Sequence, residues 1–407
     1  MRFFGLRPQN DSKEVICILS GGNMDFELTE EQKMVKEMVR KFAEEEIVPV
    51  ARENDINEHF PLEIIKKMAP LGLLGGPIPE EYGGAGLDFI SDAIIFEEIG
   101  KADSSIRTTL SVQVHLVGLA ILNWGSEEQK EKYLPRLCKG EILGCFALTE
   151  PGAGSDAANQ STTAVLTNKG WVLNGTKTWI SNGSIADISI VFAQTEISKG
   201  HKGIAAFIVE KGMHGFTTKE IKGKLGLRSS DTAELIFEDC IIPKDALLDK
   251  VGDGFKVAMS ALDNGRYGVA SGCVGIIQGC IDVCVKYAKE RHQFGKPIGS
   301  FQLIQEKIAR MVVDCDASRL LVYRAGDLKN KGIKNTLETS IAKYFASEAA
   351  VRAATEAVQI FGAYGYSNEY PVERYLRDAK VATIYEGTSE IQKLIIGHNT
   401  IGIKAFS

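Results

Sequence analysis

The chain has 407 residues, of which 44% are hydrophobic and 25% are charged, and its net charge is −6. This composition is typical of a globular protein, and the length indicates about two or three domains rather than one core. No block of like charges occurs in the sequence, so a nucleic acid is not expected as a partner.

Residues 1–23 lack the periodicity that follows them. Their best apolar run, residues 15–19, is too short for a signal-peptide core or a membrane span, so no membrane insertion is expected. Either Met24 is the true start of the protein or residues 1–23 form a disordered extension.

Residues 24–144 are predicted to form an all-helical domain. Thr29 and Gln32 have the spacing of a capping box, and Pro61 opens a second helix. After the first cap, apolar residues recur on one face of the predicted helix: Met34, Val35, Met38, Val39 and Phe42.

Residues 145–251 are predicted to form an antiparallel β domain. The β-rich runs are 170–180, 186–194, 203–210, 216–221 and 233–242. Turn signals at Asn174-Gly175 and Asn182-Gly183 are expected to separate strands.

Residues 252–407 return to a helical period and predict a four-helix bundle. Its helices are expected at 255–291, 301–331, 337–361 and from Ser389 onward. Small residues dominate 341–357, which is consistent with close helix packing, including packing against another subunit. The predicted fold is therefore α+β and multidomain, with helical, β and helical parts in succession.

Eight cysteines are scattered along the chain without a Cys-x-x-Cys pair or a histidine cluster. This pattern argues against structural zinc, and no metal site is expected. Free, buried thiols fit a reducing cytoplasmic compartment better than a secreted disulfide scaffold.

Residues 382–392 contain the main candidate for a catalytic base. Glu386 lies between Tyr385 and Gly387, and Ser389 with Gln392 has the spacing of a capping box, so Glu386 is expected just before a helix N-terminus. A carboxylate there can project into a cleft. The alternative is a solvated loop acid without a catalytic role.

Residues 148–156 combine two glycines, a proline and short oxygen-bearing side chains. Such a loop can present N–H and hydroxyl groups to a phosphate or a polar ring edge, or it can be a plain turn between domains. Trp179 and Ser181 follow shortly and offer a flat aromatic ring and a hydroxyl.

Two basic positions have a functional and a structural interpretation. Residues 291–296 either bind a pyrophosphate or compensate the C-terminal end of a helix. Arg266 either binds an anion or pairs with a nearby acid.

Four segments, 146–156, 178–182, 291–296 and 384–388, occur in an order that resembles the FAD-dependent acyl-CoA dehydrogenase family, and the match runs from Met24 to the C-terminus. The resemblance implies a homotetramer with FAD between the β domain and the C-terminal bundle. It also implies an acyl-CoA substrate and an electron-transferring flavoprotein as the electron acceptor.

By position, the resemblance assigns flavin contacts in two groups. The first surrounds the ring and comprises Phe146, Leu148, Thr149, Ser155, Trp179, Ser181 and Thr388. The second reaches FAD across a subunit interface and comprises Arg291, Phe294, Gln359 and Gly362. Asp263 and Arg266 would face CoA, and Ser155 would lie where flavin and CoA meet. Ala363 and Glu390 depart from residues frequent in the family.

The chemistry gives these parts a physical reason. A hydrogen α to a thioester is too weakly acidic for an unaided carboxylate, so the developing enolate needs hydrogen bonds and burial against the flavin. Glu386 would remove this proton while hydride leaves the β carbon for FAD. A desolvated Glu386 should have a raised pKa.

Residues 104–113 resemble the glutaryl-CoA dehydrogenase branch, in which the arginine matching Arg107 binds the distal carboxylate of the substrate. Thr108, Tyr385 and Gly387 would also contact the substrate. The alternative is that Arg107 pairs with Glu97 or Asp103. Gly100 replaces an acid of that branch, which suggests a roomier pocket for a bulkier dicarboxylic thioester such as benzylsuccinyl-CoA.

Other substrates and functions remain open at this point. A short-chain enzyme acting on butyryl-CoA would need no ligand for Arg107, and a cyclic carboxyl-CoA is a further candidate. An acyl-CoA oxidase or a non-catalytic flavin-binding scaffold would be different functions. The resemblance does not decide whether decarboxylation follows oxidation.

Overall fold

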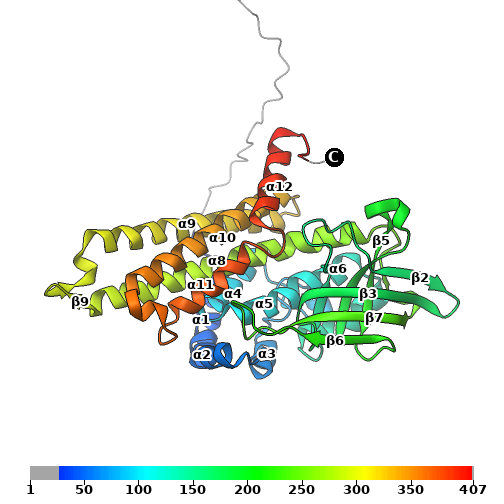
Figure 1. Cartoon of the computed structure of the whole chain (residues 1–407), viewed down its shortest axis with the longest axis horizontal. Helices are drawn as coiled ribbons and strands as arrows, with labels where there is room; N and C mark the ends of the chain where they lie inside the picture. Colours follow the sequence, from blue (N-terminus) through cyan, green and yellow to red (C-terminus); the bar gives the residue numbers. More distant parts are fainter. Residues whose placement is uncertain (1–26, 406–407) are drawn as a thin grey trace, which may run out of the picture.

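The computed structural model describes residues 27–405 and shows a helical part, a β-sheet and a long helical bundle in chain order (Figure 1). The extension expected at residues 1–23 lies outside the described residues. The N-terminal part contains α1 (Glu30–Phe42), α2 (Val48–Asn57), α3 (Leu62–Met68), α4 (Phe89–Ala102), α5 (Ser104–Ser111), α6 (Leu119–Trp124) and α7 (Glu127–Cys138).

The first helix begins as its sequence predicts. The Thr29 hydroxyl accepts from the Gln32 N–H at 3.2 Å, and the Gln32 side chain accepts from the Thr29 N–H at 3.0 Å. This reciprocal capping box satisfies two backbone donors that no helical carbonyl can reach.

The middle part is one sheet, with strand order β6-β7-β3-β2-β4-β5-β8 and β1 paired with β4. Its strands are β1 (Gly144–Ala147), β2 (Thr163–Thr167), β3 (Gly170–Ser181), β4 (Ile188–Gln194), β5 (Ile204–Glu210), β6 (Phe216–Glu220), β7 (Thr232–Ile242) and β8 (Leu247–Leu248). All five strand regions expected from the sequence are present. The sheet is mostly antiparallel, but β1 and β2 run parallel to β4, which differs from the fully antiparallel expectation.

Only one of the two expected turns separates strands. Asn182-Gly183 follows β3 as predicted, whereas Asn174-Gly175 lies inside β3, where the pairing with β7 shifts register. A Cβ at Gly175 would lie 2.5 Å from the Thr162 hydroxyl, so this glycine permits close contact with a neighbouring segment rather than a chain reversal.

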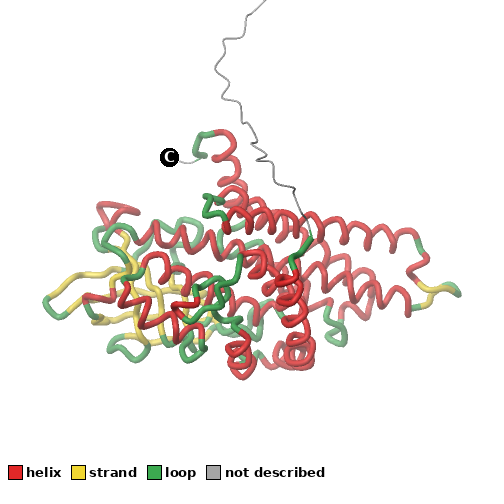
Figure 2. Tube along the Cα trace, turned by 180° about the vertical axis from the view of Figure 1, so that it is seen from behind, coloured by secondary structure: helices red, strands yellow, loops and turns green. Residues whose placement is uncertain are grey.

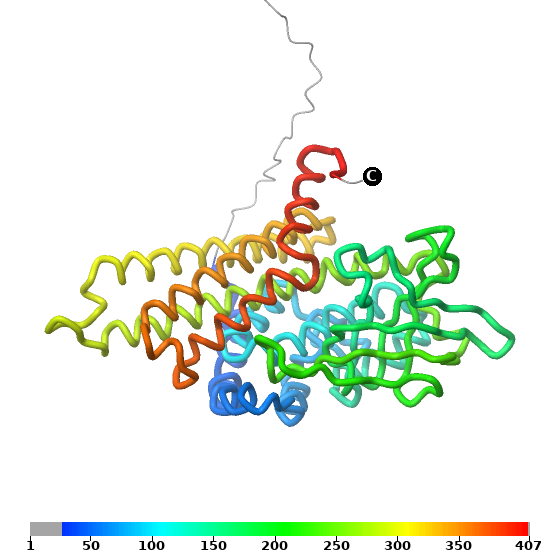
Figure 3. Tube along the Cα trace, in the orientation of Figure 1, coloured from blue at the N-terminus to red at the C-terminus, as the bar shows by residue number. Residues whose placement is uncertain are grey.

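The C-terminal part contains α8 (Gly254–Glu290), α9 (Gln302–Asn330), α10 (Thr336–Phe361), α11 (Val372–Ala382) and α12 (Ser389–Ile401). A small hairpin of β9 (His292–Gln293) and β10 (Lys296–Pro297) joins α8 to α9. The fourth helix of the bundle is α11, which the sequence analysis missed, while α12 projects from the bundle (Figure 3).

Helix α8 connects all three parts. It contacts α4 of the N-terminal part, α9 and α10 of the bundle, and β5 of the sheet. Seen from behind, the strands gather at one end of the molecule and the bundle extends to the other (Figure 2). A hydrophobic core that includes Phe146, Ile190 and Val257 joins the sheet to the start of α8.

Within residues 27–405, the helical stretches 104–124 and 254–290 are long and apolar enough to cross a membrane, but both are mainly buried inside the protein. Such burial is the behaviour of core helices. The described cysteines are also buried free thiols, as expected: Cys138, Cys145, Cys240, Cys273, Cys280, Cys284 and Cys315.

Candidate functional site

Glu386 lies in the turn between α11 and α12. The helix cap differs from the predicted one, because Thr388 rather than Ser389 occupies the N-cap, and its hydroxyl accepts from the Ile391 N–H at 3.3 Å. The Ser389 hydroxyl instead donates to Glu348 Oε1 at 2.5 Å. The turn thus ends one residue earlier than the sequence pattern indicated.

The Glu386 side chain is half-buried, and one of its two carboxylate oxygens is held away from water. Its backbone has a left-handed φ of 53°, and its Oε2 atom is buried without a hydrogen-bond partner. A Cβ at Gly265 of α8 would lie 2.0 Å from this oxygen, so only glycine there leaves room for the carboxylate. The solvated-acid interpretation is therefore wrong.

Burial raises the pKa of Glu386 to about 7, although the positive charges of Arg107, Lys343 and Arg266 oppose this rise. Desolvation disfavours the carboxylate form because the charge loses its water. A proton acceptor with such a pKa suits general-base chemistry near neutral pH.

The backbone of this turn is fixed by three side chains from three helices. Arg266 Nε donates to the Glu386 carbonyl at 3.0 Å, and Lys343 Nζ donates to the Gly387 carbonyl at 2.7 Å. Gln392 Nε2 donates to both carbonyls, at 3.2 Å and 3.0 Å. The sequence analysis missed Lys343 as a site residue, although a lysine beside Ala342 on a small-residue helix was a usable signal.

Arg107 on α5 lies beside the same turn. Its Nη2 donates to the Tyr385 hydroxyl at 2.5 Å, while its Nε and Nη1 are buried without a partner. The residue is only 3% exposed. Thr108, its neighbour, donates its hydroxyl to the Ser104 carbonyl at 2.9 Å. Arg107 therefore has two free donors next to the candidate base.

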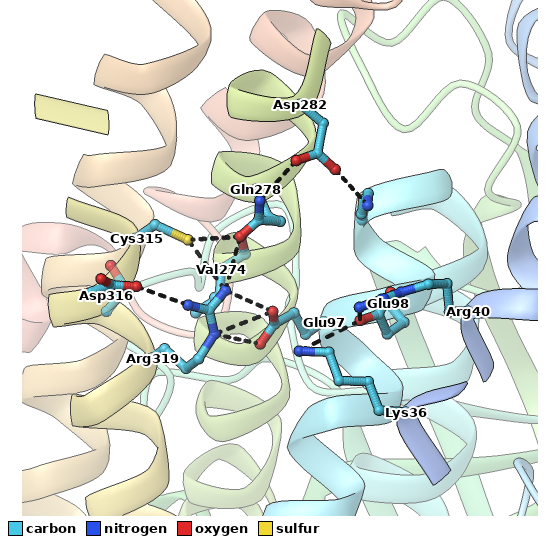
Figure 4. Close-up of polar contacts among 12 residues, drawn as sticks. Lys36, Arg40, Glu97, Glu98, Val274, Gln278, Asp282, Cys315, Asp316 and Arg319 are labelled. Carbon is cyan, nitrogen blue, oxygen red and sulfur yellow. Dashed lines mark hydrogen bonds and ion pairs between the residues drawn. The ribbon is translucent and has the colours of Figure 1, made fainter. Parts of the chain in front are cut away.

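Glu97 and Asp103, the alternative partners of Arg107, bind other groups. Glu97 accepts from Arg319 Nη2 at 2.8 Å, as Figure 4 shows. Asp103 caps α5 by accepting from the N–H groups of Ser105 and Ile106. The interpretation of Arg107 as a member of a pair with either acid is wrong.

Gly100 does not open the pocket as expected. It lies on α4 against α8, where an added Cβ would be 2.9 Å from the Gly272 carbonyl oxygen. The same Gly272 faces the Arg107 side chain, since a Cβ there would lie 2.6 Å from Arg107 Cδ. Gly100 thus permits close packing of the two helices, and the argument for a bulkier substrate from this position fails.

Asp263 and Arg266 form an ion pair, with Arg266 Nη1 2.8 Å from Asp263 Oδ1. The Thr336 hydroxyl donates to the other carboxylate oxygen at 2.7 Å. Arg266 is almost fully buried and supports the Glu386 turn, so the interpretation as a partner of a nearby acid is confirmed. The CoA-facing role of both residues stays a prediction.

The loop at residues 148–156 is anchored by a buried ion pair. Lys177 Nζ lies 2.7 Å from Glu150 Oε1, and both side chains are at most 1% exposed. Lys177 also donates to the Leu148 carbonyl at 3.3 Å, and the Thr178 N–H donates to the Thr149 carbonyl at 2.9 Å. Neither charged residue was singled out from the sequence.

This loop and β3 present a surface suited to a flat ring. Trp179 is 62% exposed and has a φ of 59° at a bulge of β3, where any ordinary strand residue would be extended. Gly152 and Gly154 have no neighbouring atom within 4 Å of a built Cβ, and Ser155 is exposed. Phe146 and Leu148 are buried, and Ser181 is half-buried. The residues fit a stacked aromatic cofactor.

The second group of predicted cofactor contacts lies at the opposite end of the molecule, around the β9 hairpin (Figure 1). Phe294 is 92% exposed, and the Arg291 guanidinium lies 5.6 Å from the Tyr364 ring centroid. Gln359 and Gly362 end α10 beside them and are exposed. Within one chain, the helical bundle extends between this hairpin and the sheet (Figure 1).

Comparison with known proteins identifies the chain. Residues 29–141, 145–240 and 252–401 match the N-terminal, middle and C-terminal domains of acyl-CoA dehydrogenases. The short-chain specific acyl-CoA dehydrogenase of Clostridium acetobutylicum is 48% identical over 92% of this chain and 98% of its own length. The glutaryl-CoA dehydrogenase of Desulfococcus multivorans is 43% identical over 94% and 99%.

Solved structures agree. Butyryl-CoA dehydrogenase of Megasphaera elsdenii has a TM-score of 0.91 and 45% identity, covering 93% of this chain and all of that one. A chain from work on the electron-transferring flavoprotein of Acidaminococcus fermentans has a TM-score of 0.92 and 48% identity, with the same coverage. These matches show that the chain belongs to the acyl-CoA dehydrogenase family of FAD-dependent oxidoreductases.

Proposed function

We propose that the chain oxidises short-chain acyl-CoA thioesters at the α,β bond, with Glu386 as the base that removes the α proton. The observation that carries this proposal is the buried, unpartnered Oε2 of Glu386, on a group whose pKa is raised to about 7. An oxygen without a donor is free to accept a proton from a substrate.

The remaining site residues orient the reactants. FAD supplies the acceptor for the β hydride when it is bound. We assign its ring to the surface formed by Trp179, Ser181 and the loop at residues 148–156, because this surface is open and lies on a rigid sheet. The backbone N–H of Glu386 would donate to the thioester oxygen and stabilise the enolate.

The length of the acyl group is inferred from the relatives. The short-chain enzyme is more similar to this chain than the glutaryl-CoA enzyme is, at 48% against 43% identity. The butyryl-CoA dehydrogenase structure covers the fold at a TM-score of 0.91. These similarities favour butyryl-CoA, or a thioester of similar length, as the substrate.

A second candidate is a short acyl group with a distal carboxylate, as in glutaryl-CoA. Arg107 favours it, because an almost fully buried guanidinium with two unpaired nitrogens is costly unless a ligand accepts from them. A carboxylate is the planar, bidentate partner that such a group binds best. The observation concerns the substrate alone and leaves the role of Glu386 unchanged.

The test is anaerobic bleaching of the flavin at about 450 nm on mixing with butyryl-, glutaryl- or benzylsuccinyl-CoA. Bleaching by butyryl-CoA that is lost in Glu386→Gln supports the main proposal. A dicarboxylic thioester that bleaches faster, with the advantage lost in Arg107→Ala, supports the second. Bleaching of Glu386→Gln at the wild-type rate would reject the base.

We further propose a cytoplasmic homotetramer that delivers electrons to an electron-transferring flavoprotein. The β9 hairpin, which Arg291 and Phe294 flank, lies at the opposite end of the molecule from the sheet that carries Trp179 and Ser181, which fits a flavin site shared between subunits (Figure 1). Exposed apolar residues on α9, such as Val313 at 67% and Leu320 at 50%, offer an interface. Sedimentation would measure the assembly, and flavin reoxidation by a purified electron-transferring flavoprotein would test the acceptor.

A further inference from the structure

Lys343, on α10, is a charged residue that contacts the turn containing Glu386. It is completely buried, and its ammonium donates to the Gly387 carbonyl at 2.7 Å. Among residues 27–405, no carboxylate lies within ion-pair distance of it. A buried, unpaired ammonium is costly, so its presence needs a compensating role.

The turn that Lys343 holds is strained. Glu386 has a left-handed φ of 53°, a value that residues with a side chain adopt only at an energetic cost. Only contacts from the surroundings can keep such a backbone in place. The carbonyls of Glu386 and Gly387 together accept four hydrogen bonds, from Arg266, Lys343 and Gln392.

The three donors differ in charge. Gln392 is neutral, and Arg266 is neutralised by its pair with Asp263. Lys343 alone among these donors brings a charge without a carboxylate at ion-pair distance. Glu386 is faced by Arg107 from α5, Arg266 from α8 and Lys343 from α10, and all three favour its ionised form.

We propose that Lys343 is a positioning residue for the catalytic base: it fixes the turn through the Gly387 carbonyl, and its charge keeps the Glu386 carboxylate ready to accept a proton. This inference rests on the proposed role of Glu386. Lys343 itself is faced by Cys273 and Arg266 from α8 and by Glu348 on its own helix. Burial lowers the pKa of Lys343 to about 8, so its charge is present at neutral pH and is lost in alkaline solution.

The experiment isolates proton removal from oxidation. A short acyl-CoA analogue with sulfur in place of the β carbon keeps its α hydrogens but has no β hydrogen to transfer. Glu386 takes an α proton, exchanges it with D2O and returns a deuteron, so the analogue gains mass without any redox change. Mass spectrometry gives this exchange rate across pH for the flavin-loaded wild type and each variant.

Lys343→Met removes the charge and the hydrogen bond with little change in volume. We expect it to slow exchange about tenfold or more, and to move the acid limb of the pH profile upward by about one unit. In steady-state turnover kcat should fall while KM stays nearly unchanged. Gln392→Leu, which removes only neutral donors, should slow exchange without moving the limb.

The outcomes separate this inference from the proposed function. If the wild type exchanges the α proton and Lys343→Met has the same exchange rate and the same acid limb of the pH profile, Lys343 has no positioning role. An equal shift of the acid limb in Gln392→Leu would also overturn the proposal, because the charge of Lys343 would then not be the cause of the shift. If Lys343→Met does not fold, Lys343→Gln serves instead, with the same expected limb shift. Absence of exchange in wild type, or full exchange in Glu386→Gln, rejects the base itself.

Discussion

Two glutamates with shielded carboxylate oxygens, Glu150 and Glu386, show how the same side chain is put to different uses. Glu150 Oε1 accepts from Lys177 and the Thr162 N–H, and Oε2 accepts from the N–H and hydroxyl of Ser161. At Glu386 the neighbouring donors are spent on backbone carbonyls, and Oε2 has no partner.

The consequence is visible in their pKa values. Burial opposes ionisation of Glu150, but the Lys177 charge and the hydrogen bonds outweigh it and lower the pKa to about 2. At Glu386 burial prevails over three nearby cations, and the pKa rises to about 7. Burial or nearby charge alone does not explain the difference. An acid whose carboxylate oxygens all accept hydrogen bonds can anchor a loop, whereas an acid with an unpartnered oxygen can accept a proton.

Breaking the Glu150 pair should give the largest loss of stability. Glu150→Gln leaves Lys177 buried without a counter-charge, and we expect unfolding to require about 3–5 kcal/mol less free energy. Denaturant unfolding followed by fluorescence measures this loss. The double variant Glu150→Gln with Lys177→Met should recover part of this loss. If the double variant instead loses as much stability as the two single variants together, the two residues are uncoupled.

Crowding the Glu386 carboxylate should reduce activity more than stability. In Gly265→Ala the new methyl group would overlap Oε2, whose distance from the built Cβ is only 2.0 Å. We expect kcat to fall about 10–100-fold, because a displacement of about 1 Å is enough for such a loss.

Gly397→Ala on α12 is the matched control, since a Cβ there meets nothing within 4 Å. It should leave kcat unchanged and stabilise the helix by about 0.5–1 kcal/mol. Turnover assays and melting curves of both variants measure the contrast. Equal kcat values for Gly265→Ala and wild type would mean that the carboxylate does not need its observed position.

The smallest effect concerns pH and stability, and the two glutamates should differ in sign. The pKa of Glu386 is raised from 4.5 to about 7 on folding, so its favourable contribution is present below about 4.5 and is lost as pH rises through 7. The pKa of Glu150 is lowered to about 2, so its contribution is present above about 4.5 and lost toward pH 2.

Glu386→Gln should therefore melt a few degrees higher than wild type at pH 8, and the difference should shrink toward pH 5. Calorimetry of the substrate-free enzyme at both pH values measures it. A difference that does not change between pH 5 and pH 8 would contradict the raised pKa.

Much of the fold was predictable because periodicity reports which face of an element is buried. The helices at 255–291, 301–331 and 337–361 agree with α8, α9 and α10 to within one residue at each end. Helix α11 was missed, and Asn174-Gly175 was taken for a turn although it forms a bulge within β3. A turn signal cannot distinguish a chain reversal from a place where another segment approaches closely.

At the site, sequence pattern located the reactive side chain but not what holds it. Glu386 was recognisable from its motif, whereas Lys343, Gly265 and the Glu150–Lys177 pair act through contacts between segments distant in the chain. The same limit misled the interpretation of Gly100, whose role depends on the facing Gly272 of another helix.

Under the proposed assembly, two defective alleles of this gene can complement each other. Glu386 lies in the turn between α11 and α12, whereas Arg291 and Phe294 flank β9, at the end of the bundle far from the sheet (Figure 1). A subunit with a defective base still contributes an intact Arg291 to the flavin site of its neighbour. A subunit that lacks Arg291 still contains an intact base. A mixed oligomer of the two would thus regain working sites that neither parent has, and heterozygous activity would exceed that of either mutant alone.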